Sequence, residues 1–129
     1  YASENFRVFA QVDDEFTELE SDEASIGYRM EPGEDQAVFK TRALDLSVTK
    51  SLVIVSDGIL DQKGGAKGLS LGRRRLLRLL QEAMVNNNSL PRLDGARLMA
   101  AIKDYQGDEE QRDDMTLIVL SLPKEIQDI

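Results

Sequence analysis

Residues 52–58 read LVIVSDG, so the apolar run Leu52–Val55 is followed directly by serine, aspartate and glycine. The apolar run predicts a buried β-strand. Gly58 allows a sharp turn that presents the carboxylate of Asp57 at the end of that strand. Taken alone, these residues are explained more simply by an ordinary Asp-Gly turn in solvent.

A second acidic stretch precedes the last apolar run of the chain. Residues 112–120 read RDDMTLIVL, which places Asp113 and Asp114 at the amino end of a strand predicted over residues 117–122. If the two strands are antiparallel neighbours, their acidic ends meet at one edge of a sheet. Carboxylates held close together repel each other unless a cation neutralises them, so a site for a hard metal ion is the first hypothesis.

The composition narrows the chemistry that is available. The chain has 129 residues, of which 41% are hydrophobic, enough for the core of one compact domain. Its net charge of −8 argues against a nucleic-acid partner. The absence of histidine and cysteine excludes Ser-His-Asp and Cys-His catalysis and leaves oxygen atoms as metal ligands, which suits Mg, Mn or Ca. No apolar run is long enough to cross a bilayer.

Hydrophobic periodicity predicts strands first, then two helices, then one further strand. Predicted strands or extended segments cover residues 6–12, 16–20, 25–29, 37–46, 51–55 and 117–122, and predicted helices cover 72–85 and 94–105. The glycine-rich residues 64–72 predict a flap beside the acidic edge. This order of elements predicts an α+β fold with an antiparallel sheet rather than alternating βαβ units.

The two acidic motifs, with two helices between them, resemble the carboxyl-terminal half of the PPM family of metal-dependent serine/threonine protein phosphatases. They are most similar to its bacterial SpoIIE-like branch, in which a TDG tip precedes two helices and a DDxT or DNxT tip precedes the last core strand. Further likenesses lie at Tyr1–Ser3, at Ser25–Tyr28 and at Asp61-Gln62 with Gly64-Gly65. The last of these resembles sensor-linked phosphatases that act on STAS-domain proteins.

The resemblance implies a fold, an activity and a set of site residues. The fold is an αββα sandwich, of which residues 1–123 supply the carboxyl-terminal half, one antiparallel sheet with two helices, and residues 124–129 form a tail. The activity is hydrolysis of phosphoserine or phosphothreonine by water that two or more Mn²⁺ or Mg²⁺ ions activate. The catalytic metal ligands are Asp57 and Asp113, and the supporting residues are Gly58, Asp114 and Thr116.

The family's remaining acidic ligands, which lie on GD and DGHG-type motifs, have no match in this chain. Because the chain begins with Tyr1, we expect it to be part of a longer product, inactive alone and completed by the remaining half of the domain. The expected substrate is a phosphorylated protein, such as a STAS-domain regulator. The expected location is the cytoplasm, including the cytoplasmic part of a membrane-anchored sensor.

Two other functions stay open. The chain could be a non-catalytic phosphatase-like interaction module that assembles through an open sheet edge, for example as a swapped homodimer. A calcium-binding domain is a weaker alternative. The arginines Arg73, Arg74, Arg75 and Arg78 could attract a phosphorylated partner, although a solvated helix face is the simpler interpretation.

Overall fold

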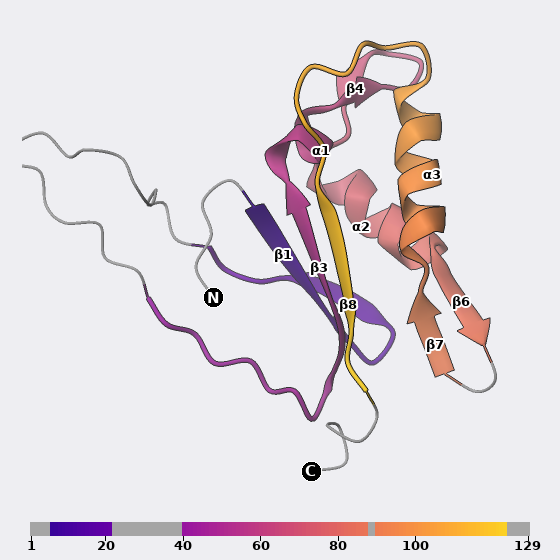
Figure 1. The fold of residues 1–129 in the computed structure, drawn as a ribbon. Coiled ribbons are helices and arrows are strands. Elements are labelled where there is room, and N and C mark those ends of the chain that lie inside the picture. The colour runs from indigo at the N-terminus through magenta and orange to yellow at the C-terminus, as the bar shows by residue number, and fades with distance from the viewer. Residues whose placement is uncertain (1–5, 22–39, 88–89, 124–129) are drawn as a thin grey trace, which may run out of the picture.

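The computed structural model describes residues 6–21, 40–87 and 90–123 of the chain (Figure 1). In these residues, the strands β1, β2, β3 and β8 form one sheet in the order β2-β1-β3-β8, and each pairing is antiparallel. Two short hairpins, β4–β5 and β6–β7, accompany the sheet. The elements are β1 (Phe6–Val12), β2 (Glu15–Glu18), β3 (Thr49–Ser56), α1 (Asp57–Asp61), β4 (Lys63–Gly64), β5 (Leu69–Ser70), α2 (Gly72–Glu82), β6 (Met84–Asn87), β7 (Leu90–Leu93), α3 (Gly95–Gln106) and β8 (Leu117–Ser121). The predicted α+β class with an antiparallel sheet is confirmed.

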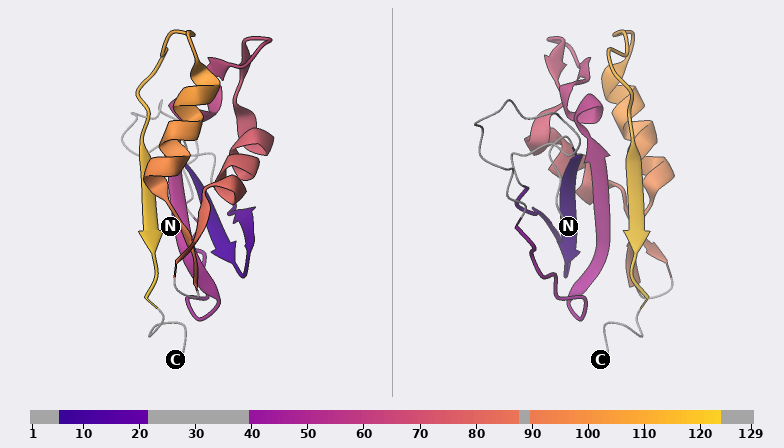
Figure 2. Two further views of the ribbon diagram at one scale, coloured as in Figure 1. Left: turned by 90° about the vertical axis from the view of Figure 1, so that its right-hand side faces the viewer. Right: turned by 60° about the vertical axis from the view of Figure 1, so that its left-hand side comes forward.

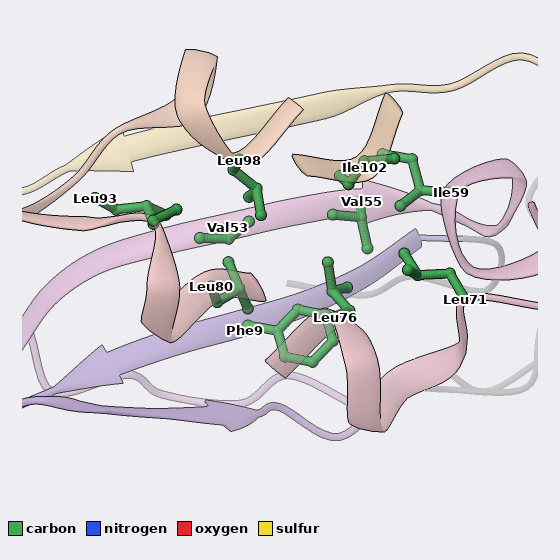
Figure 3. Packing of buried hydrophobic residues seen from close by; sticks show 11 residues of the cluster. Phe9, Val53, Val55, Ile59, Leu71, Leu76, Leu80, Leu93, Leu98 and Ile102 are labelled. Carbon is green, nitrogen blue, oxygen red and sulfur yellow. The ribbon is translucent and has the colours of Figure 1, made fainter. Parts of the chain in front are cut away.

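The helices α2 and α3 lie on the same face of the sheet (Figures 1 and 2). Alternation along β3 turns Val53 and Val55 toward the helices, and a four-residue spacing on α2 places Leu76 and Leu80 opposite them. Figure 3 shows these side chains meeting in one layer. The buried cluster consists of Phe9, Val53, Val55, Ile59, Leu71, Leu76, Leu80, Ala83, Leu93, Leu98 and Ile102.

The opposite face of the sheet is apolar as well. Leu52 and Ile54 alternate with the core residues of β3, and the register pairs them with Leu120 and Ile118 of β8. Ile118 is 43% exposed and Leu120 is 46% exposed. A sheet with two apolar faces is typical of an inner layer rather than of an outer one.

The helix predicted from residue 94 is confirmed, and its start is explained by a side-chain cap. The carboxylate of Asp94 accepts hydrogen bonds from the backbone N–H groups of Ala96 at 3.0 Å and Arg97 at 3.1 Å. Gly107 ends the helix with a φ of 56°, a conformation that glycine adopts without strain. Among the described helices, none is both long and apolar enough to cross a membrane.

The helix predicted over residues 72–85 is three residues too long. It ends at Glu82, and residues 84–87 form β6 instead, paired with β7. The backbone N–H of Asp94 donates to the carbonyl of Ala83 at 3.1 Å, so the hairpin leads directly back to the end of α2. Met84 continues the apolar spacing of α2, and therefore periodicity alone did not reveal the change of structure.

The strand predicted over residues 37–46 is wrong for its described part, because residues 40–46 form no strand. A turn follows instead, in which the carboxylate of Asp45 accepts from the backbone N–H and hydroxyl of Ser47 at 2.9 and 2.6 Å. The strand predicted over residues 51–55 is longer at both ends, because β3 runs from Thr49 to Ser56. The predictions for residues 1–3, 25–29, 37–39 and 124–129 lie outside the described residues.

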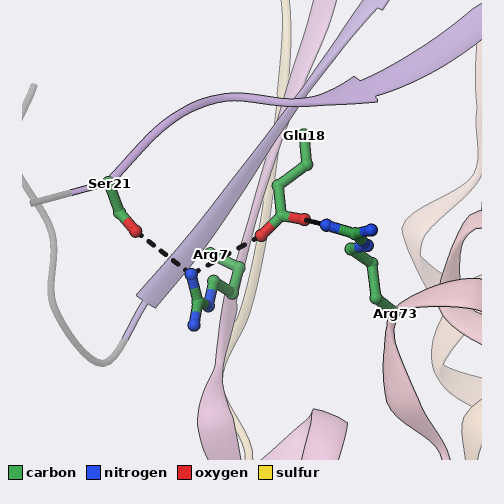
Figure 4. Close-up of polar contacts among 4 residues, drawn as sticks. All are labelled: Arg7, Glu18, Ser21 and Arg73. Carbon is green, nitrogen blue, oxygen red and sulfur yellow. Dashed lines mark hydrogen bonds and ion pairs between the residues drawn. The ribbon is translucent and has the colours of Figure 1, made fainter.

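An ion-pair chain connects α2 to the edge of the sheet. The carboxylate of Glu18 on β2 lies 3.0 Å from Arg73 of α2 and 3.7 Å from Arg7 of β1 (Figure 4). The Arg7 guanidinium also donates to the hydroxyl of Ser21 at 3.1 Å. Arg73 thus has an intramolecular partner, which supports the simpler interpretation of the arginine cluster. Exposed pairs of this kind contribute about 0–1 kcal/mol each.

Candidate functional site

The two acidic motifs are joined through Ser56 and Thr116. The backbone N–H of Ser56 donates to the carbonyl of Thr116 at 3.0 Å, and the N–H of Thr116 donates to the hydroxyl oxygen of Ser56 at 2.9 Å. The Ser56 hydroxyl donates in turn to the carbonyl of Asp114 at 3.3 Å. The end of β3 and the start of β8 therefore meet at one edge of the sheet, as the antiparallel arrangement predicts.

Gly58 lies against the second motif. A β-carbon on Gly58 would lie 3.4 Å from Cβ of Asp113 and 3.1 Å from the carbonyl carbon of Asp114, with the carbonyl oxygen of Asp114 closer still. Gly58 is buried within α1 and does not have the positive φ of a tight turn. The sequence predicted a turn here, but the reason for glycine is the close approach of two backbones.

Asp57 is the first residue of the one-turn helix α1 and is exposed. It directly precedes Gly58, whose backbone approaches the loop that carries Asp113. Asp113 is exposed too, and its Oδ1 accepts a hydrogen bond from the backbone N–H of Asp114 at 2.8 Å. The side chain of Gln111 donates to the carbonyl of Asp113 at 2.9 Å, which adds a second hydrogen bond within this loop.

The two remaining supporting residues contribute mainly through their backbones. Asp114 offers its carbonyl to Ser56, and its own side chain is exposed. Thr116 contributes its N–H and carbonyl, and its side chain is likewise exposed. Sequence reasoning assigned no role to Ser56, which stands at the threonine position of the family's TDG motif. Its retained hydroxyl was the signal that this side chain connects the two motifs.

The carboxylates at this edge are the type of ligand that Mn²⁺ and Mg²⁺ prefer, because hard divalent ions bind oxygen atoms. The number of these carboxylates is small, however, for a complete metal site. In the part of the chain that the structure describes, no group of three or more histidine, cysteine, aspartate or glutamate side chains is placed to hold a metal ion. Asp57 and Asp113 would therefore provide only a fraction of the six-ligand shell that Mg²⁺ takes.

A pocket of about 400 Å³ lies next to Asp113, between α1 and the β4–β5 hairpin. Its walls include Gln62, Lys63, Ser70 and Arg112. Figure 1 shows α1 and β4 at the same end of the sheet. Sequence reasoning used Gln62 only as a mark of resemblance and did not identify Lys63. The glycine-rich stretch does lie beside the acidic edge, as predicted.

Tyr105 of α3 holds that hairpin in place. Its hydroxyl donates to the carbonyl of Leu69 at 2.8 Å, and its own carbonyl accepts from the N–H of Gly65 at 2.8 Å. Arg75 lies over its ring, 5.3 Å from the centroid, and donates to the carbonyl of Ser70 at 3.1 Å. A second arginine of the predicted cluster is thus engaged within the fold.

Comparison with known proteins agrees with this architecture. A scan of protein families matches the stage II sporulation protein E (SpoIIE) family over residues 6–123. Among solved structures, the fold is similar to the SiaA-PP2C domain of Pseudomonas aeruginosa, with a TM-score of 0.60 and 22% sequence identity. That likeness covers 95% of this chain and 45% of the other, so the chain spans less than half of that structure's length. A search of curated proteins gives no match. The chain belongs to the SpoIIE family, in the SpoIIE-like branch of the PPM phosphatases, and represents part of such a phosphatase domain.

Proposed function

We propose that the protein hydrolyses phosphoserine or phosphothreonine on a protein substrate, as part of a larger metal-dependent phosphatase domain. The observation that carries this proposal is the meeting of the Asp57 and Asp113 segments at one edge of the sheet, through Ser56 and Gly58. Membership of a phosphatase family supports the reaction class.

Asp57 and Asp113 would hold Mn²⁺ or Mg²⁺. Bound ions of this kind activate water as a nucleophile and neutralise the phosphoryl oxygens. The backbone N–H of Asp114 orients one oxygen of Asp113 and leaves the other for a ligand. The Ser56 hydroxyl and the absence of a side chain at Gly58 keep the segments that carry the two carboxylates close together. The protein thus contributes positioning rather than a nucleophile of its own.

The rest of the metal shell and the cover of the sheet would come from the remaining half of the domain. Two carboxylates are too few for the shell, and the apolar face with Ile118 and Leu120 is open to a second layer. Covering such a face removes apolar surface from water at about 25 cal/mol per Å². We therefore expect residues 1–129 alone to release no phosphate, a prediction that a direct assay of this chain with Mn²⁺ can overturn.

The central test is Asp57→Asn and Asp113→Asn in the phosphatase domain that contains this chain. Each change keeps the side-chain size, removes a charged oxygen ligand and is expected to reduce Mn²⁺-dependent release from a phosphopeptide to background. Asp13→Asn is the matched control, because Asp13 is an exposed residue of the turn between β1 and β2, at the opposite end of the sheet from Ser56. Circular dichroism should be unchanged in all three variants. Full activity in either site variant would refute the metal-ligand assignment.

For the substrate we propose a phosphorylated STAS-domain protein and for the location the cytoplasm, including attachment to a membrane-anchored sensor. The motif at Asp61-Gln62 with Gly64-Gly65 supports the first proposal, through its resemblance to phosphatases of that specificity. The strongly acidic charge supports a protein rather than a nucleic-acid partner. Phosphate release from a phosphorylated STAS protein, compared with an unrelated phosphoprotein, tests the choice of substrate.

An interaction module is the second candidate, and the exposed apolar residues of β8 favour it. Within the described sheet, β2 and β8 are the edge strands, and Ile118 and Leu120 lie on one of them. A second copy of the chain could form a strand pair with β8 or cover the apolar face that carries Ile118 and Leu120. Light scattering that shows a stable dimer of the chain without phosphatase activity would favour this function, whereas a monomer argues against it.

A further inference from the structure

One buried polar atom beside the acidic edge lacks a hydrogen-bond partner in the part of the chain that the structure describes. The side chain of Gln62 is 1% exposed, and its Nε2 donates to the carbonyls of Lys63 at 2.9 Å and Glu110 at 3.2 Å. Its Oε1 is buried and has no hydrogen-bond partner among the described residues. Two carbonyl acceptors fix the orientation of the amide, since a flipped amide would bring its oxygen against both of them.

The unused oxygen belongs to a residue that lines the pocket next to Asp113. A buried acceptor without a partner is unfavourable, so a ligand that donates a hydrogen bond to it gains affinity. The pocket's volume of about 400 Å³ lies within the range of ligand sites. The pocket therefore suits a ligand that donates a hydrogen bond and lies between α1 and the hairpin, next to Asp113.

Two cationic side chains line the same pocket. Lys63 and Arg112 both contribute to its wall, and neither forms an ion pair in the described part of the chain. Asp61 is the other acidic residue of the wall besides Asp113. If Asp113 binds a metal ion, as the proposed function requires, the pocket as a whole attracts anions. Unpaired lysine and arginine side chains in its wall suit anionic groups such as carboxylates.

We propose that this pocket binds the peptide chain next to the phosphorylated residue of the substrate. The Gln62 Oε1 accepts a hydrogen bond from a main-chain N–H of that peptide, and Lys63 and Arg112 bind acidic side chains that flank the phosphoserine or phosphothreonine. The pocket thus selects phosphoproteins with acidic flanking sequences. The inference rests on the proposed phosphatase activity.

The test compares three substrates on the phosphatase domain that contains this chain. They are a phosphopeptide with glutamates around the phosphoserine, the same peptide with lysines, and 4-nitrophenyl phosphate, which has no peptide chain. The unaltered protein should prefer the acidic peptide. In Lys63→Glu and Arg112→Glu, the ratio of kcat/KM between the acidic and basic peptides should fall by at least roughly tenfold, mainly through KM, because each loses an ion pair to the substrate.

Two further variants complete the test. Arg92→Glu is the matched control, since Arg92 is an exposed residue of β7 that does not line the pocket, and its peptide ratio should equal that of the unaltered protein. Gln62→Met removes the buried acceptor and should raise KM for both peptides more than for 4-nitrophenyl phosphate. If Gln62→Met fails to fold, the two charge variants still decide the question.

The outcomes separate the two proposals. If the unaltered protein releases no phosphate from any of the three substrates with Mn²⁺, the phosphatase function is refuted and the subsite with it. If the unaltered protein acts on all three but the charge variants leave the peptide ratio unchanged, or slow every substrate equally, the subsite alone is refuted.

Discussion

Gly58→Ala tests whether the close approach of α1 to the Asp113 loop is a requirement of the fold. The added β-carbon would lie 3.1 Å from the carbonyl carbon of Asp114, whereas carbon atoms in contact prefer about 3.5–4.0 Å. The obstructing atoms are backbone, and the carbonyl of Asp114 accepts from the hydroxyl of Ser56. No side-chain rotation can relieve the contact, so the loop must move by roughly 0.5–1 Å.

The cost follows from this displacement. Overpacking of a well-packed region typically costs about 1–3 kcal/mol, and the greater helix propensity of alanine returns up to about 1 kcal/mol within α1. The net loss in free energy of unfolding should be about 1–2 kcal/mol. For a domain of this size, that corresponds to a decrease in Tm of roughly 4–8 °C. Urea unfolding and thermal unfolding, both followed by circular dichroism, measure the two quantities.

Gly95→Ala is the matched control. Gly95 also lies in a helix, and its added β-carbon would meet a methyl group of Val119 at 3.2 Å, which a small side-chain shift can relieve. Its free energy of unfolding should change by less than about 1 kcal/mol. Equal stability of Gly58→Ala and the unaltered protein would show that the loop tolerates the displacement, and the reasoning from close approach would then be refuted.

Three further changes test the helix cap, the core and the turn before β3. Asp94→Ala should lower the free energy of unfolding by about 0.5–2 kcal/mol because two N–H groups of α3 lose their acceptor, whereas Asp94→Ser should restore most of it; urea unfolding decides. Leu98→Ala should cost about 2–5 kcal/mol, since Leu98 is fully buried, and a loss below 1 kcal/mol would contradict the described core. The side-chain and backbone hydrogen bonds from Ser47 hold the pKa of Asp45 below its ordinary value of 3.8, and Ser47→Ala should raise it, as NMR titration would show. Because that pKa is lowered on folding, its contribution to stability is present above the ordinary pKa and is lost as the pH falls through the folded value, a dependence that Ser47→Ala should weaken.

Sequence reasoning succeeded where a local signal and the tertiary structure agree. The apolar runs at Leu52–Val55 and Leu117–Leu120 form paired strands, and Asp94 marks the start of α3. Their antiparallel pairing followed from the order of elements, and it brings Asp57 and Asp113 to one edge. Each of these predictions depends on residues close together in the chain or on a general rule of topology.

Sequence reasoning failed where the structure depends on contacts between residues that are far apart in the chain. Met84 continues the helical spacing of α2, yet it begins β6, because a hairpin partner that returns toward Ala83 is available. Residues 40–46 alternate like a strand, but alternation does not supply a neighbouring strand. The role of Gln62 depends on the carbonyl of Glu110, 48 residues away, and no short motif shows such a contact.

The hydrogen bonds between Ser56 and the segment before β8 also bear on the order of folding. The bond to Thr116 closes a loop of 60 residues that contains both larger helices and both hairpins. Closing a loop of that length costs conformational entropy that these elements must first repay by packing. We therefore expect the two acidic segments to meet late in folding, after α2 and α3 have docked. If Asp57 and Asp113 hold Mn²⁺ or Mg²⁺ as proposed, the ion would bind only to a chain whose folding is nearly complete, and its binding would report the finished fold rather than initiate it.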